Sequence, residues 1–392
     1  MSGIDQTVKA LGDGTVVTSS TGQYLFKLSS FGRNPVVKPR DIGLTWYEND
    51  ELQVGAVFNG GAELLEGNII LTPRCHRGYQ KAKFLDERLG IDRVSFEKYV
   101  SEIWPMVSED GIHFARLKEM VIRGDGTDQK DFVHGLEDMR IIKYGERYLL
   151  IGCGKVKPPF QGGNGDRIAV YSTKNFLQTI YHGIVDSFDS RNVVSFPEPI
   201  LGKVYMLLRF HPNIHIDSLE NGLSQLLKPS QHLESWNEIY NRRSENLLLK
   251  KGRYPHETEK IGVGPPPIKT ERGWLLIYHA VGEIDEDICR VYGLSQKINR
   301  GYSICAAILD IRDPTKVLCR STHPIYVPSA TWELYGDETY PIDVPAVVFP
   351  VGAVVWKDKL LLYCGSGDKY VVLLSCSLRS LIEYLWSKCR SK

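Results

Sequence analysis

Apolar and polar residues alternate in short runs along most of the chain, and these runs come in pairs joined by tight turns. The clearest pair is "MRIIKY" followed by "RYLLIGCG", with the turn residues Gly145 and Glu146 between them. This pattern predicts a β-hairpin. Four other segments share the design of an apolar strand, a turn and a second apolar strand, and they cover residues 58–74, 191–210, 260–281 and 343–367.

Recurring β units of this size are typical of the blades of a β-propeller. Prolines inside several of the first strands disfavour long central strands of a flat sheet. Further β segments, such as "RIAVYSTKNF" and "GYSICAAILDIRDPTKVLCRS", are candidates for the outer strands of the blades. The sequence therefore predicts an all-β fold and a single domain over residues 1–392.

Three segments do not fit the hairpin pattern. Residues 84–104 have mixed helical spacing, and residues 378–390 place Leu381, Ile382 and Leu385 on one helical face. We expect both to be peripheral helices used for packing or for oligomer contacts, and we leave the oligomeric state open. Residues 214–259 are polar, and we expect an insertion that forms a lid or rim loop.

Composition and charge exclude several classes of function. Charged residues make up 24% of the chain and the formal net charge is +1, which gives no reason to expect nucleic acid or a membrane as partner. The N-terminus has no basic and apolar segments of a secretory signal. The eight cysteines form no C-x-x-C pair, so we expect free thiols in the cytoplasm. His211 and His215 are separated by Pro212 and lie in no zinc motif, so no metal site is expected.

The ends of the hairpins carry the candidate chemistry. A hairpin returns to the edge where it began, so blades around one axis would bring these ends to one mouth. Guanidinium groups match phosphate or carboxylate, and a carboxylate beside sugar hydroxyls serves acid catalysis. Because cations outnumber acids, the set favours a glycoside phosphorylase, in which phosphate is the nucleophile. The converging residues are Asn59, Arg74, Asp138, Arg191, Arg209, Lys260, His279 and Asp343.

Four motifs in these hairpins resemble those of a known family. They are "GLEDMRI", "RNVVSFPEPI…LLRFHP", "IGVGPPPIKT…GWLLIYHAV" and "DVPAVVFPVGAVV". The four motifs resemble those of the β-mannoside phosphorylases of glycoside hydrolase family 130 and of the related β-1,2-mannan mannosyltransferase/phosphorylases. The resemblance implies a five-bladed β-propeller. It also implies inverting, reversible phosphorolysis of β-1,2-linked manno-oligosaccharides to α-mannose 1-phosphate, with inorganic phosphate as co-substrate and no other cofactor.

The resemblance also assigns roles to individual residues. Asp138 is the general acid that it implies, and Glu137 is expected to support it. The phosphate ligands that it implies are Arg191, Asn192, Arg209, His279 and Tyr302. The mannose-binding residues that it implies are Asn59, Arg74, Lys260 and Asp343. Met139 stands where the family has proline, which leaves the subfamily open.

Three alternatives remain at this point. The first is a β-1,2-mannosyltransferase that uses GDP-mannose, and the second is a phosphorylase for β-1,4-mannosides. The third is a propeller that binds a sugar or a protein without catalysis. An acid at position 138 also needs a raised pKa at neutral pH; we expect Glu137 or Asp343 to favour the protonated form and Arg140 to oppose it.

Overall fold

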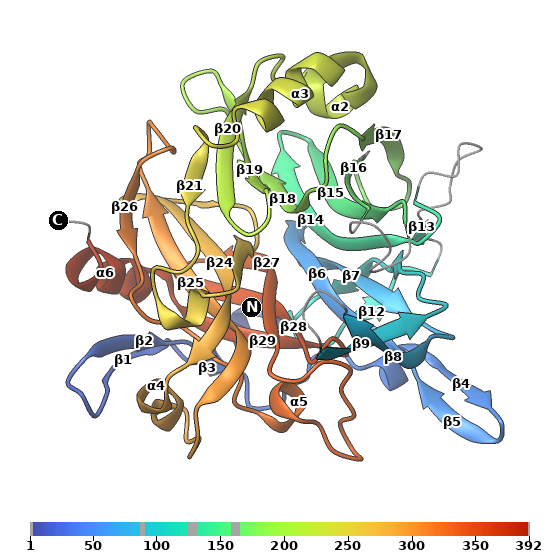
Figure 1. Cartoon of the computed structure of the whole chain (residues 1–392), viewed down its shortest axis with the longest axis vertical. Coiled ribbons are helices and arrows are strands. Elements are labelled where there is room, and N and C mark those ends of the chain that lie inside the picture. Colours follow the sequence, from blue (N-terminus) through green and yellow to red (C-terminus); the bar gives the residue numbers. More distant parts are fainter. Residues whose placement is uncertain (1–2, 87–90, 119, 124–131, 158–164, 391–392) are drawn as a thin grey trace.

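The chain forms five antiparallel sheets around one axis in the computed structural model, which describes residues 3–86, 91–118, 120–123, 132–157 and 165–390 (Figure 1). This arrangement is a five-bladed β-propeller and confirms the predicted all-β fold. Each predicted hairpin supplies the two inner strands of one blade. Because every inner strand begins near the axis, the hairpin ends converge there.

The blades are numbered in chain order, and each sheet contains the following strands. Blade one has β6 (Ala56–Leu65), β7 (Asn68–His76), β10 (Glu102–Ile103), β11 (Met106–Ser108), β12 (Ala115–Arg116) and β13 (Ile122–Arg123). Blade two has β14 (Leu136–Tyr144), β15 (Arg147–Lys155), β16 (Asp166–Thr173) and β17 (Ile180–Val185). Blade three has β18 (Arg191–Ser195), β19 (Val204–Arg209), β20 (Ile214–Leu219) and β21 (Leu247–Leu249).

The last two blades complete the ring. Blade four has β22 (Lys260–Val263), β23 (Ile268–Thr270), β24 (Gly273–Ile284), β25 (Ile298–Leu309) and β26 (Val317–Arg320). Blade five has β27 (Val348–Trp356), β28 (Lys359–Ser366), β29 (Tyr370–Ser377) and the N-terminal strand β3 (Ser29–Ser30). Since β3 pairs with β29, the two ends of the chain are joined in one sheet, which closes the propeller.

Short elements decorate the outside of the ring. Three hairpins are formed by β1 (Thr15–Thr18) with β2 (Tyr24–Lys27), β4 (Thr45–Glu48) with β5 (Glu51–Val54), and β8 (Gln80–Asp86) with β9 (Ile91–Glu97). The α-helices are α1 (Gly3–Ala10), α2 (Leu223–Leu227), α3 (Leu233–Asn241), α4 (Glu286–Val291), α5 (Thr331–Leu334) and α6 (Leu378–Lys388). Three 3-10 turns are Pro39–Ile42, Pro229–His232 and Pro255–Glu257.

The helix predicted for residues 84–104 is wrong. Apart from residues 87–90, which lie outside the described part of the chain, the segment contains β8, β9 and β10. Strands β8 and β9 pair from Gln80 opposite Glu97 to Asp86 opposite Ile91. Short apolar runs do not distinguish strand from helix by periodicity. Tertiary contacts decide here, because Phe96 and Tyr99 stack at 5.0 Å and both pack edge-on against Tyr79.

The helix predicted for residues 378–390 is confirmed as α6. Ser377 caps its first turn by accepting a hydrogen bond from the backbone N–H of Ser380 (3.1 Å). Its buried face carries Leu381, Ile382 and Leu385, which pack on the core between blades four and five. Burying three such side chains contributes about 1.5–3 kcal/mol each, so the helix is an integral part of the fold.

The insertion predicted for residues 214–259 contains fewer residues than expected. Strands β20 and β21 at its two ends belong to the sheet of blade three. Only the part between them, with α2 and α3, leaves the sheet, and it covers the outer end of that blade (Figure 1). The apolar face of α3 is held by Trp236 and Ile239, which are buried in the core shared by blades two, three and four.

The hydrophobic core lies between neighbouring blades. Separate clusters join blades one and two, blades two to four, blades four and five, and blades five and one. Met139 is fully buried in the first of these clusters, so its side chain packs behind the mouth of the propeller. Among the described helices, none combines the length and apolarity needed to cross a membrane.

Candidate active site

Three of the predicted site residues occupy equivalent β-bulges in neighbouring blades. The register between the two inner strands shifts by one residue after Phe58 in blade one, after Glu137 in blade two and after Arg191 in blade three. The next residue in each case is Asn59, Asp138 or Asn192, with φ of +54°, +49° and +54°. Asparagine and aspartate tolerate this left-handed backbone better than other non-glycine residues. The bulges turn three short polar side chains away from the strand alternation, as bulges near active sites do.

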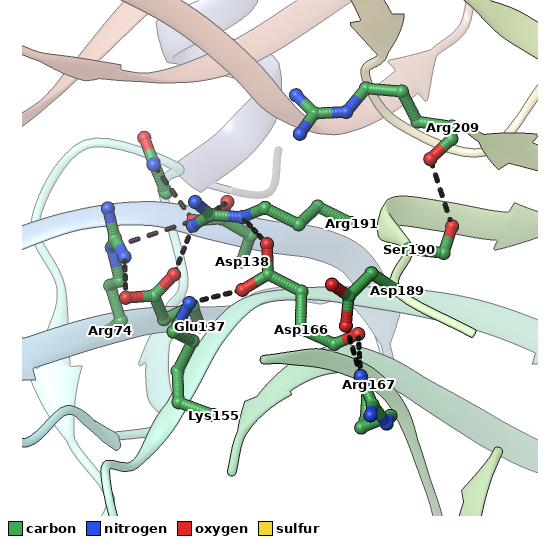
Figure 2. Close-up of polar contacts among 11 residues, drawn as sticks. Arg74, Glu137, Asp138, Lys155, Asp166, Arg167, Asp189, Ser190, Arg191 and Arg209 are labelled. Atoms are coloured by element: carbon green, nitrogen blue, oxygen red, sulfur yellow. Dashed lines mark hydrogen bonds and ion pairs between the residues drawn. The ribbon is translucent and has the colours of Figure 1, made fainter. Parts of the chain in front are cut away.

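Asp138 is surrounded by donors from both neighbouring blades. Asn59 Nδ2 donates to its Oδ1 over 2.9 Å, and Arg74 Nε lies 3.5 Å from the same oxygen. On the other side, Arg191 Nη2 lies 3.9 Å from Oδ2. Asp138 is only 3% exposed, so these contacts take the place of solvent (Figure 2). The structure thus unites the predicted acid with two of its predicted sugar ligands and one predicted phosphate ligand.

Glu137 joins the two arginines that flank Asp138. Arg74 Nη1 lies 2.9 Å from Glu137 Oε1, and Arg191 Nη2 forms a hydrogen bond with Glu137 Oε2. Burial alone would raise the pKa of Glu137, but Arg191 and Arg74 outweigh it and lower the pKa to about 2. The supporting role predicted for Glu137 is therefore a permanent negative charge that holds two cations in place. A carboxylate with this pKa is ionised at neutral pH and does not supply a proton.

Arg209 and His279 lie together beside this network. A Cβ atom on Gly262 would stand 2.3 Å from His279 Cε1 and 3.0 Å from Arg209 Cδ, so the absence of a side chain at Gly262 makes room for both. Nε of Arg209 and both ring nitrogens of His279 are buried without a hydrogen-bond partner among the described residues. Unpaired buried polar atoms are costly, and a bound anion would accept hydrogen bonds from Nε of Arg209 and from the protonated ring nitrogen of His279.

Positive charges surround Arg209 and His279. Burial, followed by Arg209 and Lys260, holds the pKa of His279 well below its usual range, so its imidazole is neutral. Burial would raise the pKa of Tyr302, but Lys260 and Arg300 lower it below its usual value. The Nζ atom of Lys260 lies 5.2 Å from the ring centre of Tyr302. The predicted ligands Arg209, His279, Lys260 and Tyr302 therefore form one cationic cluster, with Asn192 buried at the bulge of blade three.

Asp343 lies in a second cluster, where it is bound by protein groups. Tyr79 donates a hydrogen bond to its Oδ2, and Lys369 Nζ lies 3.2 Å from Oδ1. Lys369 also donates to the hydroxyl of Tyr79 over 2.8 Å. These contacts occupy both oxygens of Asp343, so its predicted contact with mannose has to compete with Tyr79 and Lys369.

The sequence reasoning missed Asp368, which follows β28 of blade five. Burial raises the pKa of Asp368 to about 6, and Arg74 opposes this shift while Asp138, Asp343 and Glu137 add to it. The residue has φ of +51°. The signal in the sequence was the turn "GSGDKY", whose polar residues end the last hairpin. Asp368 is thus an acid close to Asp138 that titrates near neutral pH.

Two further residues shape the site from behind. Gly365 of β28 faces Asn59, because a Cβ atom at Gly365 would stand 1.8 Å from Asn59 Oδ1. Arg140 is fully buried and donates to the carbonyl oxygens of Asp138 (2.6 Å), Val263 (2.9 Å) and Gly264 (3.2 Å). Arg140 therefore ties blade two to blade four and contacts the backbone of Asp138 rather than its carboxylate.

Metal-ligating residue types come together in one other place among the described residues. Ligand atoms of His256, Glu257 and Cys305 lie within 4.8 Å of one another inside blade four. Both oxygens of Glu257 already accept hydrogen bonds from Arg320, each over 2.7 Å, and Tyr278 donates to one of them. The guanidinium of Arg320 takes the position that a cation would need. This cluster is therefore a buried ion pair with its own hydrogen bonds.

The fold and the site together define a class of protein. The five-bladed propeller holds a buried aspartate between an amide and two arginines, and one of these arginines is the cross-strand partner of Arg209 in a cationic cluster with unpaired buried nitrogens. This combination is expected of a carbohydrate-active enzyme that uses an acid and an anion.

The comparisons with known proteins give the family. The family model of glycoside hydrolase family 130, described as beta-1,4-mannooligosaccharide phosphorylase, matches residues 30–386, and the chain belongs to this family. A 1,2-beta-oligomannan phosphorylase of Thermoanaerobacter sp. (strain X514) is 30% identical over 347 residues, covering 88% of this chain and 96% of the relative. A beta-1,4-mannooligosaccharide phosphorylase of Ruminococcus albus is 30% identical over 315 residues, covering 79% and 82%.

A solved structure agrees with the propeller fold. The beta-1,2-mannobiose phosphorylase of Listeria innocua, in complex with beta-1,2-mannobiose, superposes with a TM-score of 0.64 and 23% identity. The match covers 91% of this chain and 99% of the other. At this identity the likeness concerns the fold alone.

Proposed function

We propose that the chain is an inverting β-mannoside phosphorylase that cleaves β-1,2-linked manno-oligosaccharides with phosphate and releases α-mannose 1-phosphate. The observation that carries the proposal is the pair Arg209 and His279, whose buried nitrogens are unpaired among the described residues and lie among positive charges. Arg209 is the cross-strand partner of Arg191, which approaches Asp138 to 3.9 Å. A glycoside hydrolase needs a second carboxylate to activate water, whereas phosphate is already a nucleophile. Arg191, Arg209 and His279 supply donors for an anion in place of that base.

The reaction follows from the positions of the two groups. Phosphate bound by Arg191, Arg209 and His279 attacks the anomeric carbon of the terminal mannose, and the bond from that carbon to the glycosidic oxygen breaks. The departing oxygen takes a proton that originates on Asp138 and passes through a hydroxyl of the bound mannose. Asn59, Arg74 and Lys260 bind mannose hydroxyls, and the family resemblance adds Asp343 to this group. Asn192 and Tyr302 complete the phosphate site.

The phosphate requirement is the decisive test. Purified enzyme is incubated with β-1,2-mannotriose with and without inorganic phosphate, and mannose 1-phosphate and free mannose are quantified by chromatography. We expect mannose 1-phosphate only when phosphate is present. Equal release of free mannose in phosphate-free buffer would contradict the proposal and indicate a hydrolase. Asp138→Asn is expected to abolish activity in both directions while the protein remains folded.

The linkage is tested in the synthetic direction. β-1,2 is favoured because the relative acting on 1,2-β-oligomannan aligns over a larger part of this chain than the β-1,4-specific relative. Mannose 1-phosphate and mannobiose acceptors of each linkage are supplied, and the products are identified by NMR. Products with β-1,4 bonds would overturn the linkage and leave phosphorolysis standing. Incorporation from GDP-mannose but not from mannose 1-phosphate would show a mannosyltransferase.

The cellular location belongs to the same proposal. All eight cysteines are free and buried, with no disulfide between them. Free thiols are the normal state in a reducing compartment, which supports the cytoplasm. The test is fractionation of the native host with an antibody against the chain, and recovery from the culture medium would contradict the assignment.

A further inference from the structure

Asp166 and Lys155 form a buried ion pair that the proposed chemistry does not use. They are cross-strand partners at the ends of β16 and β15 in blade two, and Lys155 Nζ forms a hydrogen bond with Asp166 Oδ1. Their side chains are only 3% and 4% exposed. A buried pair of this kind contributes little net stability, because desolvation offsets the attraction between the charges. A role other than stability is therefore worth seeking.

The other oxygen of Asp166 reaches the neighbouring blade. Arg191 Nε lies 3.5 Å from Asp166 Oδ2, while Nη2 of the same arginine binds Glu137 (Figure 2). The backbone supports this arrangement, because the N–H of Ser190 donates to the carbonyl oxygen of Asp166 over 3.1 Å. The carboxylates of Asp166 and Glu137, on different strands, therefore contact two different nitrogens of the Arg191 guanidinium. The carboxylate contacts that the structure shows for Arg191 involve Nε and Nη2, so the N–H groups on Nη1 can serve an anion.

The charges alternate along this chain of contacts. Arg74, Glu137, Arg191, Asp166 and Lys155 follow one another, each in contact with the next. Lys155 neutralises Asp166 from the side away from the arginine. Because Lys155 offsets the charge of Asp166, this carboxylate contacts Arg191 while adding little to the negative charge that Glu137 already places beside it.

We propose that Asp166, neutralised by Lys155, is a positioning residue that holds the guanidinium of Arg191 in the orientation that binds phosphate. The inference rests on the proposed function, in which Arg191 is a phosphate ligand. Without Asp166, the remaining acidic neighbours of Arg191 are Glu137 and, at 3.9 Å, Asp138. The guanidinium would then turn toward the acid and away from phosphate. Phosphate binding suffers from this change, whereas the mannose contacts through Asn59 and Arg74 remain.

The test removes the pair as a unit. Asp166→Asn alone would remove the carboxylate that the buried Lys155 Nζ binds and would destabilise the protein. The double variant Asp166→Asn/Lys155→Met removes both charges and keeps the net charge. Asp186→Asn is the matched control, because Asp186 pairs with Arg167 at the exposed rim of the same blade and makes no contact with Arg191 among the contacts that the structure shows. A further variant, Asp166→Glu, keeps the charge and moves the carboxylate outward by one methylene.

The measurements distinguish an effect on phosphate binding from an effect on sugar binding. We expect the KM for phosphate to rise about tenfold in the double variant, the factor expected for the loss of a charged hydrogen bond. The KM for β-1,2-mannotriose is expected to stay within twofold of the control. The melting temperature without phosphate is expected to stay within a few degrees of the control. The increase in melting temperature that phosphate produces in the parent is expected to shrink in the same variant. Asp166→Glu should show a smaller rise in the KM for phosphate.

Two results would overturn the inference. One is a parental KM for phosphate in both the double variant and Asp166→Glu. The other is an equal rise in both KM values together with a lower melting temperature, which is what a purely structural pair would give. Failure of the proposed function looks different: the parent itself would then show no dependence on phosphate, and the inference would fall with it.

Discussion

Replacing Glu137 by glutamine measures how strongly the site network is built into the fold. The side chain keeps its size but loses the charge that holds Arg74 and Arg191. In the folded protein the pKa of Glu137 falls from 4.5 to about 2, although burial alone would raise it, because Arg191 and Arg74 favour the charged form. At about 1.4 kcal/mol per pKa unit, the charge contributes about 3 kcal/mol to the free energy of unfolding. Removing one partner of a buried ion pair costs a similar amount.

The pH dependence identifies the cause. A lowered pKa stabilises the folded state fully above the pKa of the unfolded chain, near 4.5, and the stabilisation is lost as the pH falls toward about 2. Urea unfolding of parent and Glu137→Gln is therefore compared at pH 7, 5, 4 and 3 in phosphate-free buffer. The difference in free energy of unfolding is expected to be about 3 kcal/mol at pH 7 and 5, and less than half of that at pH 3.

A surface acid provides the control. Glu198 pairs with Lys269, but its side chain is 46% exposed, so Glu198→Gln is expected to change stability by less than about 1 kcal/mol at every pH. The reasoning is refuted if Glu137→Gln behaves like this control at pH 7. It is equally refuted if the loss at pH 7 persists undiminished at pH 3, because the effect would then come from packing and not from charge.

Three further substitutions test other parts of the site. Gly365→Ala places a Cβ atom 1.8 Å from Asn59 Oδ1 and should displace the side chain that donates to Asp138, so kcat/KM should fall at least about tenfold. The control Gly32→Ala, whose Cβ atom would have nothing within 4 Å, should leave kcat/KM unchanged in the same assay. Arg140→Met leaves three buried carbonyl oxygens without their donor and should lower the free energy of unfolding by about 3 kcal/mol in urea. Burial raises the pKa of Asp368 from 3.8 to about 6, so its charge destabilises the fold as the pH rises through this range. Asp368→Asn should therefore gain stability relative to the parent between pH 4 and pH 7 in thermal unfolding, and an unchanged difference would contradict this.

The hairpin ends were predictable from the sequence because two rules sufficed. Alternating apolar runs located the inner strands, and the return of a hairpin to its own edge brought Arg191 opposite Arg209, as the register shows. The same rules could not predict that residues on later strands and turns belong to the site. Asp166 begins the third strand of its blade, and Asp368 lies in the turn after the second strand of blade five. Their places depend on how neighbouring blades pack, which no single hairpin encodes.

For residues 84–104, the sequence pattern predicted the wrong type of secondary structure. Its apolar residues fit a helix about as well as strands, and only the aromatic contacts of Phe96 and Tyr99 with Tyr79 favour the strands. Tyr79 lies outside the predicted helix, so local periodicity had no access to these contacts. The bulges were also out of reach, because a one-residue register shift leaves the apolar pattern of a strand nearly unchanged.

The three bulges explain how one repeated backbone yields a site with distinct roles. Asn59, Asp138 and Asn192 have nearly the same backbone conformation in consecutive blades, yet only the middle one is an acid. Its blade is the one flanked by arginines on both sides, Arg74 from blade one and Arg191 from blade three. Arg209 and His279 lie one boundary further, between blades three and four. In the proposed inverting reaction, acid and phosphate approach opposite faces of the sugar, and the separation of Asp138 from Arg209 and His279 is consistent with that requirement.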